Sequence, residues 1–310
     1  FIASVSSVIN VGATPVFADV DLDSGNLNAS TIKKNISKQT KAIICVHLGG
    51  LPCEMDEIIK LARESDIYII EDCAQAHGAV YKKQSVGTLG DAAAWSFCQD
   101  KIMTTGGEGG MVTTNNKSLS AKMQSYKDHG KNFSKISKPQ NKFGFRWIHD
   151  SFGTNFRMTE MQSAIGRVQL TKIKDWNKKR RENAQRLFNA FSDFEDLIEV
   201  PKIPDHVNHA FYRVYVNVNE NVLKKSWDRN RILEEINLKG VPCFSGSCPE
   251  IYREKAFDLT TYAPESRLNN AKLLGEISLA FLCHPNLLDN DLEYTETVIR
   301  RILSKSTKRN

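Results

Sequence analysis

Long apolar segments are missing from this sequence of 310 residues. The longest largely apolar runs, near residues 67–70 and 279–283, are far shorter than the ~20 residues that a membrane-spanning helix requires. The first residues also lack the charged and apolar regions of a secretory signal peptide. We therefore expect a soluble, cytoplasmic protein with no membrane partner.

A disulfide framework and a zinc-binding pattern are missing as well. The seven cysteines are odd in number and scattered through the chain, unlike the dense pairs of small secreted domains. Cys243 and Cys248 lie close in sequence, but no second cysteine pair or nearby histidine completes a zinc set. The sequence therefore predicts reduced thiols and no metal site.

A strong excess of one charge is the third absence. The 42 lysines and arginines against 36 acidic residues give a net charge of only +6. Basic residues gather at 178–181 and 300–309, without the interleaved aromatic residues of proteins that bind single-stranded nucleic acid. A solvated helix face and a chain terminus explain both clusters, so we expect no nucleic-acid partner.

The first part of the chain alternates between strand and helix patterns. Apolar strand patterns separated by a helix pattern are typical of βαβ units and a mainly parallel sheet. Residues 131–141 form a polar stretch that we interpret as an exposed loop. The predicted strands are 15–19, 40–46, 66–70, 92–96 and 110–114, and the predicted helices are 55–63 and 118–126.

A long helical pattern at 158–191, with Thr159 as a possible N-cap, leads into the second part of the chain. Beyond it, alternating apolar residues at 212–218 predict a strand, and 230–239 and 292–303 predict helices. We expect an α/β protein with a large domain at 1–190, whose sheet lies between helices, and a smaller α+β domain at 191–310.

Residues 71–116 contain the side chains that are candidates for ligand binding and catalysis. Asp72 follows an apolar strand, where ligands bind in open α/β sheets. Lys101 stands between the strand that ends at Ser96 and a glycine-rich turn, where glycines permit close approach of a ligand. A lysine amine can form a Schiff base with an aldehyde such as pyridoxal phosphate. Taken singly, Asp72 could be a solvated cap, and GGEGG could be a plain loop.

Several ordered motifs resemble the DegT/DnrJ/EryC1/StrS family of sugar aminotransferases. The two main motifs are EDCAQAHGA at 71–79 and SFCQDKIMTTGGEGGMVTTN at 96–115. The others are VGATPVFADVD at 11–21, VHLGGLPCEMD at 46–56 and FGTNFRMTEMQSAIGRVQL at 152–170. The resemblance covers nearly the whole chain and implies a pyridoxal-phosphate enzyme of fold type I.

The resemblance also implies roles for residues that match the family motifs. Lys101 would be the catalytic lysine that holds pyridoxal 5′-phosphate and moves the proton. Asp72 would pair with the pyridine nitrogen, Gln75 would lie close to the phenolic oxygen, and Ser96 would bind the phosphate. Phe1, in FIAS, would stack on the cofactor ring.

The family pattern further implies a homodimer with shared active sites. Asn155 matches the asparagine that reaches the phosphate of the neighbouring subunit. Family members have a segment before the FIAS match, with a small-residue turn that holds the phosphate at a helix start. Because this chain begins at Phe1, we expect that it is an N-terminally truncated form of a longer enzyme.

The implied reaction moves an amino group, with glutamate as the expected donor, to a keto group of a nucleotide-linked sugar in polysaccharide biosynthesis. One alternative is a related sugar dehydratase, although that enzyme has a histidine at the position of Lys101. Another alternative is a non-catalytic, truncated relative with a regulatory or interaction role. The histidines at 47 and 77 could line the pocket or lie in the core, and His129 and His209 could approach the sugar nucleotide.

Overall fold

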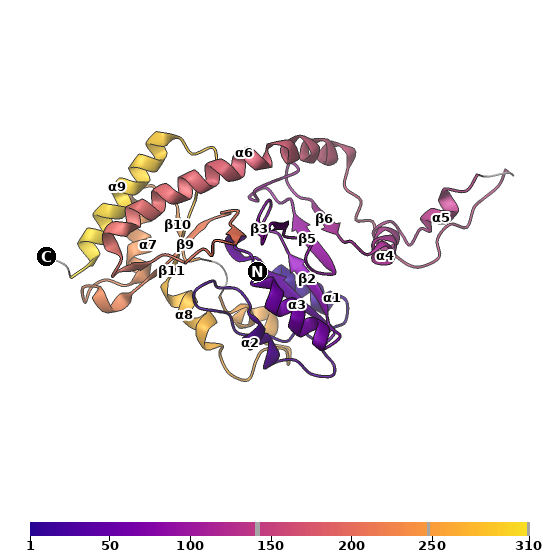
Figure 1. Cartoon of the computed structure of the whole chain (residues 1–310), viewed down its shortest axis with the longest axis horizontal. Helices are drawn as coiled ribbons and strands as arrows, with labels where there is room; N and C mark the ends of the chain where they lie inside the picture. The colour runs from indigo at the N-terminus through magenta and orange to yellow at the C-terminus, as the bar shows by residue number, and fades with distance from the viewer. Residues whose placement is uncertain (140–142, 247–248, 309–310) are drawn as a thin grey trace.

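The computed structural model describes residues 1–139, 143–246 and 249–308, so Asn141 and Cys248 lie outside the described residues. Two sheets lie at either end of the long helix α6 (Glu160–Phe191), which runs across both parts of the molecule (Figure 1). The chain is an α/β protein, as predicted. The predicted domain boundary at 190/191 falls at the C-terminal end of α6 and stays a prediction.

The first sheet has the strand order β1-β2-β5-β6. Its first three strands are parallel, and β6 is antiparallel to β5. The carboxyl ends of β1 and β2 lie together because Val46 pairs with Asp72, and Asp72 pairs in turn with Ala94 of β5. The strands are β1 (Ala42–Val46), β2 (Tyr68–Asp72), β5 (Ala92–Ser96) and β6 (Gly110–Thr113).

Helix α3 (Met55–Glu64) connects β1 to β2. Met55, Ile58 and Ala62 recur at helical spacing and are fully buried, so they form the face that packs on the core of the first sheet. Asp56 and Glu57 in the first turn and Arg63 in the last turn complement the helix dipole.

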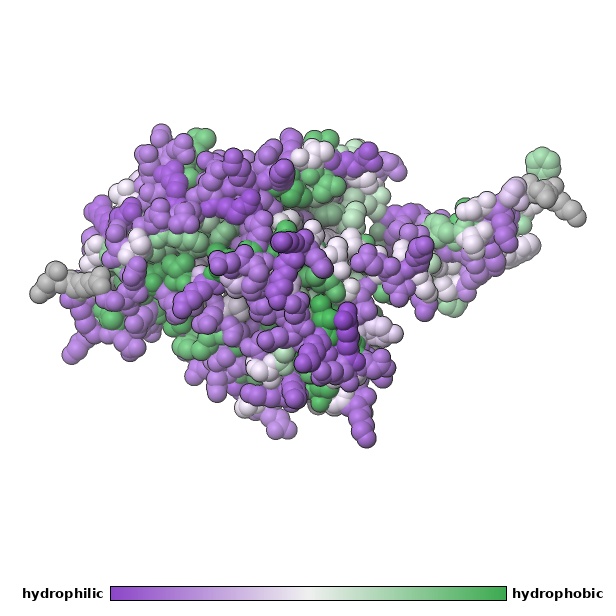
Figure 2. Space-filling view, viewed as in Figure 1, coloured by the Kyte–Doolittle hydropathy of each residue, from purple (hydrophilic) through white to green (hydrophobic). Residues whose placement is uncertain are grey.

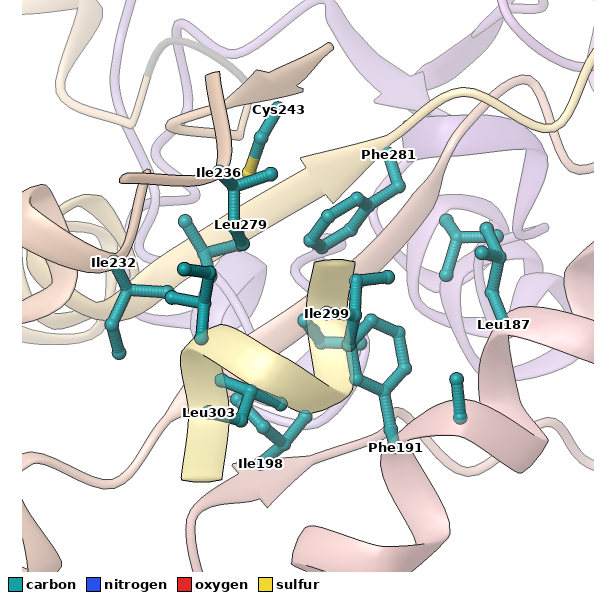
Figure 3. Close-up of a cluster of buried hydrophobic side chains, with 14 of the residues drawn as sticks. Leu187, Phe191, Ile198, Ile232, Ile236, Cys243, Leu279, Phe281, Ile299 and Leu303 are labelled. Atoms are coloured by element: carbon teal, nitrogen blue, oxygen red, sulfur yellow. The ribbon is translucent and has the colours of Figure 1, made fainter. Parts of the chain in front are cut away.

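The second sheet is antiparallel, with the order β10-β11-β9-β7. Its strands are β7 (Ile198–Glu199), β9 (Val214–Val218), β10 (Cys243–Phe244) and β11 (Ser278–Phe281). Helices α6, α7 (Arg229–Leu238) and α9 (Asp289–Ser306) pack against it (Figure 1). Leu279 and Phe281 of the sheet meet Phe191 and Ile299 of the helices in one apolar core (Figure 3).

Helix α6 joins the two parts through a row of buried polar side chains. Asn177, Arg180 and Asn183 are three residues apart, so they lie along one side of the helix. Each donates hydrogen bonds to backbone carbonyls of other segments. The acceptors are His77 for Asn177, Phe211 and Tyr212 for Arg180, and Cys283 and His284 for Asn183.

Most predicted elements are confirmed within a few residues. The helix predicted at 158–191 is a single helix, and Thr159 forms its N-terminal capping box with Gln162. The other confirmed predictions are β1, β2, β5, β6, β9, α3, α7, α9 and α4 (Lys117–Lys127).

One prediction for local structure is wrong, and a second is confirmed only in part. Residues 15–19 form no strand: Pro15 has no amide hydrogen for a ladder, and the Asp19 carboxylate instead accepts the N–H groups of Asn270 and Ala271 at 3.0 Å. The loop predicted at 131–141 contains the short helix α5 (Phe133–Ile136), because Asn132 caps it by accepting the Lys135 N–H.

The remaining elements are short. They include a three-stranded antiparallel sheet with the order β4-β3-β8. In the part of the chain that the structure describes, no helix is both long and apolar enough to cross a bilayer. The short elements are α1 (Ile2–Asn10), α2 (Ala29–Lys33), α8 (Asn269–Ile277), β3 (Val80–Tyr81), β4 (Gln84–Ser85) and β8 (Val207–Asn208).

The core of the second sheet provides a test of the fold. Ile299 is fully buried, so Ile299→Ala leaves a cavity and should lower the free energy of unfolding by about 2–5 kcal/mol in urea denaturation. Leu238→Ala, at a side chain that is 71% exposed, is the control and should change it by less than about 0.5 kcal/mol. Equal effects of the two substitutions would contradict this packing.

Candidate active site

Polar side chains gather at the carboxyl ends of the parallel strands. Asp72 is the last residue of β2, and Ser96 is the last residue of the adjacent strand β5. The Cys73 N–H donates to the Ala94 carbonyl at 2.9 Å, which extends the pairing of the two strands past Asp72. This edge is where open α/β sheets bind ligands.

The Asp72 carboxylate is held by the first helix. Ser4 of α1 donates its hydroxyl hydrogen to Asp72 Oδ2 at 2.7 Å, and the Ala74 N–H donates to Oδ1 at 3.1 Å. Phe1 precedes this turn of α1, since its carbonyl accepts the Ser4 N–H, and its ring is largely exposed. The sequence reasoning assigned no role to Ser4, although Ser4 is part of the FIAS motif.

Lys101 follows Ser96 by one tight turn. Ser96 Oγ accepts the Cys98 N–H at 3.3 Å, and the Cys98 carbonyl accepts the Lys101 N–H at 3.0 Å. The Lys101 side chain is only 17% exposed. The turn therefore fixes the backbone of Lys101 beside the carboxyl end of β5.

The glycine run lets the chain return along β5. Gly110 pairs with Ser96, and a Cβ atom at Gly110 would lie 2.9 Å from the Trp95 carbonyl oxygen. Gly106 and Gly107 have positive φ angles, which glycine adopts without steric cost. These glycines thus close the loop that carries Lys101 against its own strand.

Gln75 lies beside the loop that follows β1. Its Oε1 accepts the Gly49 N–H at 2.7 Å, and a Cβ atom at Gly50 would lie 2.9 Å from the Gln75 carbonyl oxygen. Among the described residues, the amide nitrogen of Gln75 has no hydrogen-bond partner, so it remains a free donor at this edge.

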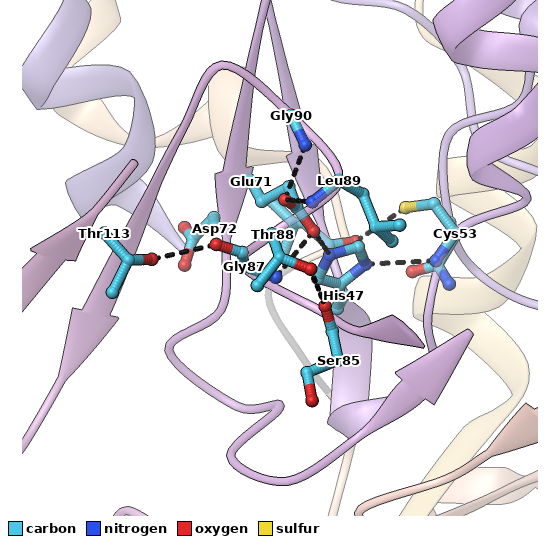
Figure 4. Close-up of polar contacts among 12 residues, drawn as sticks. His47, Cys53, Glu71, Asp72, Ser85, Gly87, Thr88, Leu89, Gly90 and Thr113 are labelled. Atoms are coloured by element: carbon cyan, nitrogen blue, oxygen red, sulfur yellow. Dashed lines mark hydrogen bonds and ion pairs between the residues drawn. The ribbon is translucent and has the colours of Figure 1, made fainter. Parts of the chain in front are cut away.

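Next to Asp72, a buried hydrogen bond between His47 and Glu71 joins the ends of the strands (Figure 4). His47 Nε2 lies 3.1 Å from Glu71 Oε2, and both side chains are fully buried. His47 Nδ1 accepts the Cys53 N–H at 3.1 Å, so the ring proton is on Nε2 and donates to Glu71. The other donors to the carboxylate are the N–H groups of Gly87 (2.8 Å), Leu89 (2.9 Å) and Gly90 (2.7 Å).

These donors set the ionisation of Glu71. Burial alone favours the neutral acid, but the hydrogen bonds from His47 and from the backbone outweigh it and lower the pKa of Glu71. The side chains of His47, Glu71 and Cys73 lie close enough together to resemble a set of metal ligands. Burial raises the pKa of the Cys73 thiol far above its usual range, so the thiol stays protonated. The hydrogen bonds described above already explain the positions of His47 and Glu71, so we interpret these three residues as part of the structural core.

Two of the histidines are buried. The His77 ring packs against Trp95 and Phe97, at 5.3 and 5.9 Å between centroids, and burial lowers its pKa to about 4. His209 stacks on Phe211 at 4.0 Å, and burial lowers its pKa to about 3. Both are therefore neutral imidazoles at physiological pH.

Asn155 lies apart from the other candidate residues. It forms a β-bridge with Asp128, the residue that follows α4, and the segment between the two contains the projecting helix α5 (Figure 1). It is exposed, and no described contact joins it to Asp72, Ser96 or Lys101. Within one chain, the structure thus gathers Asp72, Gln75, Ser96 and Lys101 at one sheet edge and leaves Asn155 outside.

Comparisons with known proteins agree on one family. The model of the DegT/DnrJ/EryC1/StrS aminotransferase family matches residues 1–301. The crystal structure of an aminotransferase from Psychrobacter cryohalolentis shares 52% identity and superposes with a TM-score of 0.96, covering 98% of this chain and 79% of that one.

Two GDP-perosamine synthases are also similar. The one from Escherichia coli O157:H7 is 38% identical over 70% of this chain and 56% of its own length. The one from Caulobacter vibrioides is 31% identical over 98% of this chain and 77% of its own length.

The buried carboxylate predicts a pH-dependent stability. Glu71→Gln puts an amide NH₂ against N–H donors and should lower the free energy of unfolding at pH 7 by about 3–5 kcal/mol, measured by urea denaturation. Because the pKa of Glu71 is lowered by folding, its contribution is complete above about pH 4.3 and is lost as the pH falls through the folded-state value.

The difference between Glu71→Gln and the wild type should therefore shrink as the pH is lowered from 7 toward 3. Glu195→Gln, at an exposed side chain, is the control and should follow the wild type at every pH. A deficit that stays constant across this range would show that the charge of Glu71 is not what stabilises the fold.

Proposed function

The chain belongs to the DegT/DnrJ/EryC1/StrS aminotransferase family, and on this premise we propose that it transfers an amino group from glutamate to a keto group of a nucleotide-linked sugar. The observation that carries the proposal is the meeting of an acid, a hydroxyl and an amine, Asp72, Ser96 and Lys101, at one sheet edge. The similarity to GDP-perosamine synthases supports a nucleotide sugar as the substrate class.

Pyridoxal 5′-phosphate is the cofactor of this enzyme family, and the donor set at the sheet edge fits it. Asp72 offers a carboxylate for the ring nitrogen, Ser96 a hydroxyl for the phosphate, and Gln75 an unpartnered amide nitrogen for the phenolic oxygen. When bound, the cofactor supplies an aldehyde that receives the amino group and a ring that accepts electrons.

The residues of the chain then have separate tasks. The Asp72 carboxylate, held by Ser4, would stabilise a proton on the ring nitrogen of the bound cofactor. The Lys101 amine takes a proton from the substrate carbon and returns one in the second half of the reaction. Because Lys101 is largely buried, water competes little for this proton.

We further propose a homodimer with shared active sites. Met161, Ile165 and Val168 recur on one face of α6, and they are 78%, 41% and 56% exposed. Met111 and Val112 of β6 are exposed as well, and apolar surface is visible near the end of α6 that faces β6 in Figure 2. A second copy of the chain would cover these side chains, and Asn155 would reach the partner's phosphate site.

Lys101 is the direct test of the proposed reaction. Borohydride reduction of the cofactor-loaded protein followed by peptide mapping should place the pyridoxyl mass on the Lys101 peptide. Lys101→Ala should abolish transamination, and Lys101→Arg should not restore it, because a guanidinium keeps its proton. The exposed Lys82→Ala is the control and should keep wild-type turnover; a label on Lys82 or Lys83 would refute the assignment.

Mixed dimers test the role of Asn155. Lys101→Ala chains and Asn155→Ala chains should each be inactive alone, and a mixture should regain up to about one quarter of wild-type activity per chain. In a hybrid dimer, one of the two sites keeps both residues. No recovery, despite proven exchange of subunits, would mean that Asn155 serves its own chain.

A further inference from the structure

The ammonium group of Lys101 lies beside two side chains that have no task in the reaction described above. Lys101 Nζ is 3.7 Å from Asp100 Oδ1 and 5.0 Å from the centroid of the Tyr212 ring. Both neighbours attract a cation, Asp100 by its charge and Tyr212 by the face of its ring. The amine therefore has a defined resting place within its own chain.

Asp100 is held more firmly than an ordinary surface carboxylate. About half of its side chain is exposed, and ion pairs at such positions are usually weak because both partners move. Here the Tyr212 hydroxyl donates a hydrogen bond to Asp100 Oδ2, and the other oxygen, Oδ1, lies nearest to Lys101 Nζ. Fixing one oxygen of the carboxylate removes much of the motion that weakens exposed pairs.

The ionisation of both residues agrees with this arrangement. Partial burial of Asp100 opposes its charge, but the Tyr212 hydrogen bond and the charge of Lys101 outweigh it and lower the pKa of Asp100. Burial, together with the neighbouring carboxylate, raises the pKa of Tyr212 to about 12. At neutral pH, Asp100 is thus ionised and Tyr212 remains a donor.

Tyr212 is itself fixed by the rest of the fold. Its side chain is buried. Its N–H donates to the Gly49 carbonyl at 2.8 Å, and its carbonyl accepts from Arg180 Nη1 of α6 at 3.3 Å. Strand β9 of the second sheet begins two residues later, at Val214. The position of the Tyr212 hydroxyl is therefore set by both parts of the molecule.

We propose that Asp100 and Tyr212 form a cradle that holds the Lys101 side chain whenever its amine is not bonded to the cofactor. This inference rests on the proposed role of Lys101. Asp100 and Tyr212 are positioning residues in this scheme, because they act through Lys101. Without them, the four rotatable bonds of the lysine would let the amine leave the sheet edge. Since Tyr212 leads into β9, the cradle also makes the resting position of Lys101 depend on the second sheet.

Competitive labelling of the ligand-free protein tests the cradle directly. Acetic anhydride is added at neutral pH, and the rate of acetylation at each lysine is measured by peptide mass spectrometry. Asp100→Asn should accelerate labelling of Lys101 about three- to fivefold, because the freed side chain samples exposed conformations. Tyr212→Phe removes one oxygen atom and should produce a similar or smaller increase. The double variant should equal Asp100→Asn, because both substitutions break one chain of contacts.

The chain provides a matched control in the exposed pair between Lys82 and Asp56. Lys82 Nζ lies 2.6 Å from Asp56 Oδ2 and 5.2 Å from the centroid of the Tyr81 ring. Asp56→Asn should leave Lys101 labelling unchanged. If Tyr212→Phe acted only by weakening the fold, it would accelerate the acetylation of buried lysines in general and lower the thermal midpoint of unfolding. In that case Asp100→Asn would not change the acetylation rate of Lys101.

The proposal would be overturned if Lys101 were labelled at the wild-type rate in Asp100→Asn. It would also be overturned if the labelling rate of the double variant rose by the product of the two single increases. Because the labelled protein contains no cofactor, this outcome is independent of transamination. If the wild type failed to bind the cofactor at Lys101, the proposed function would be wrong even where the labelling pattern supported the cradle.

Discussion

A carboxylate that is buried away from water must find hydrogen-bond donors, and Glu71 finds them in two separate segments of the chain. His47 at the end of β1 and the backbone at residues 87–90 converge on it (Figure 4). Because successive side chains of a strand point to opposite faces, burying Glu71 on one face directs Asp72 toward the other, where Ser4 meets it. The burial of Glu71 thereby sets the direction of the Asp72 carboxylate.

Helix α6 holds the two parts of the molecule together by hydrogen bonds to the backbone of both. Its polar row donates to carbonyls of the His77 loop, of the 211–212 segment and of the turn after β11. Carbonyl acceptors belong to the backbone, so these bonds fix the course of the chain. The segment at 211–212 is also the one that carries Tyr212 to Asp100, which connects the placement of the helix to the surroundings of Lys101.

The sequence was sufficient for most of the fold because its main elements have clear signals. The helix at 160–191 has both a cap and apolar periodicity, and the parallel strands are short apolar runs. Asp72, Ser96 and Lys101 were candidates from the sequence because they lie at or after strand ends, whereas Gln75 was a candidate only through the family resemblance. Ser4, Asp100 and Tyr212 were not assigned these contacts, since each partner is distant in sequence or depends on a side-chain direction. The strand prediction for residues 15–19 was wrong because their alternating pattern belongs to an irregular segment whose Asp19 caps α8.

The position of β11 within the second sheet also constrains how the protein is made. This strand comes last in the chain of that sheet, at residues 278–281, yet it lies between β10 and β9. During synthesis, β9 and β10 are therefore complete before the strand that joins them leaves the ribosome, and the edges that pair with β11 stay unpaired until then. The first sheet has no such delay, since its four strands end at Thr113. Synthesis from the N-terminus thus favours an order in which the part bearing Lys101 folds first and the second sheet closes onto it afterwards.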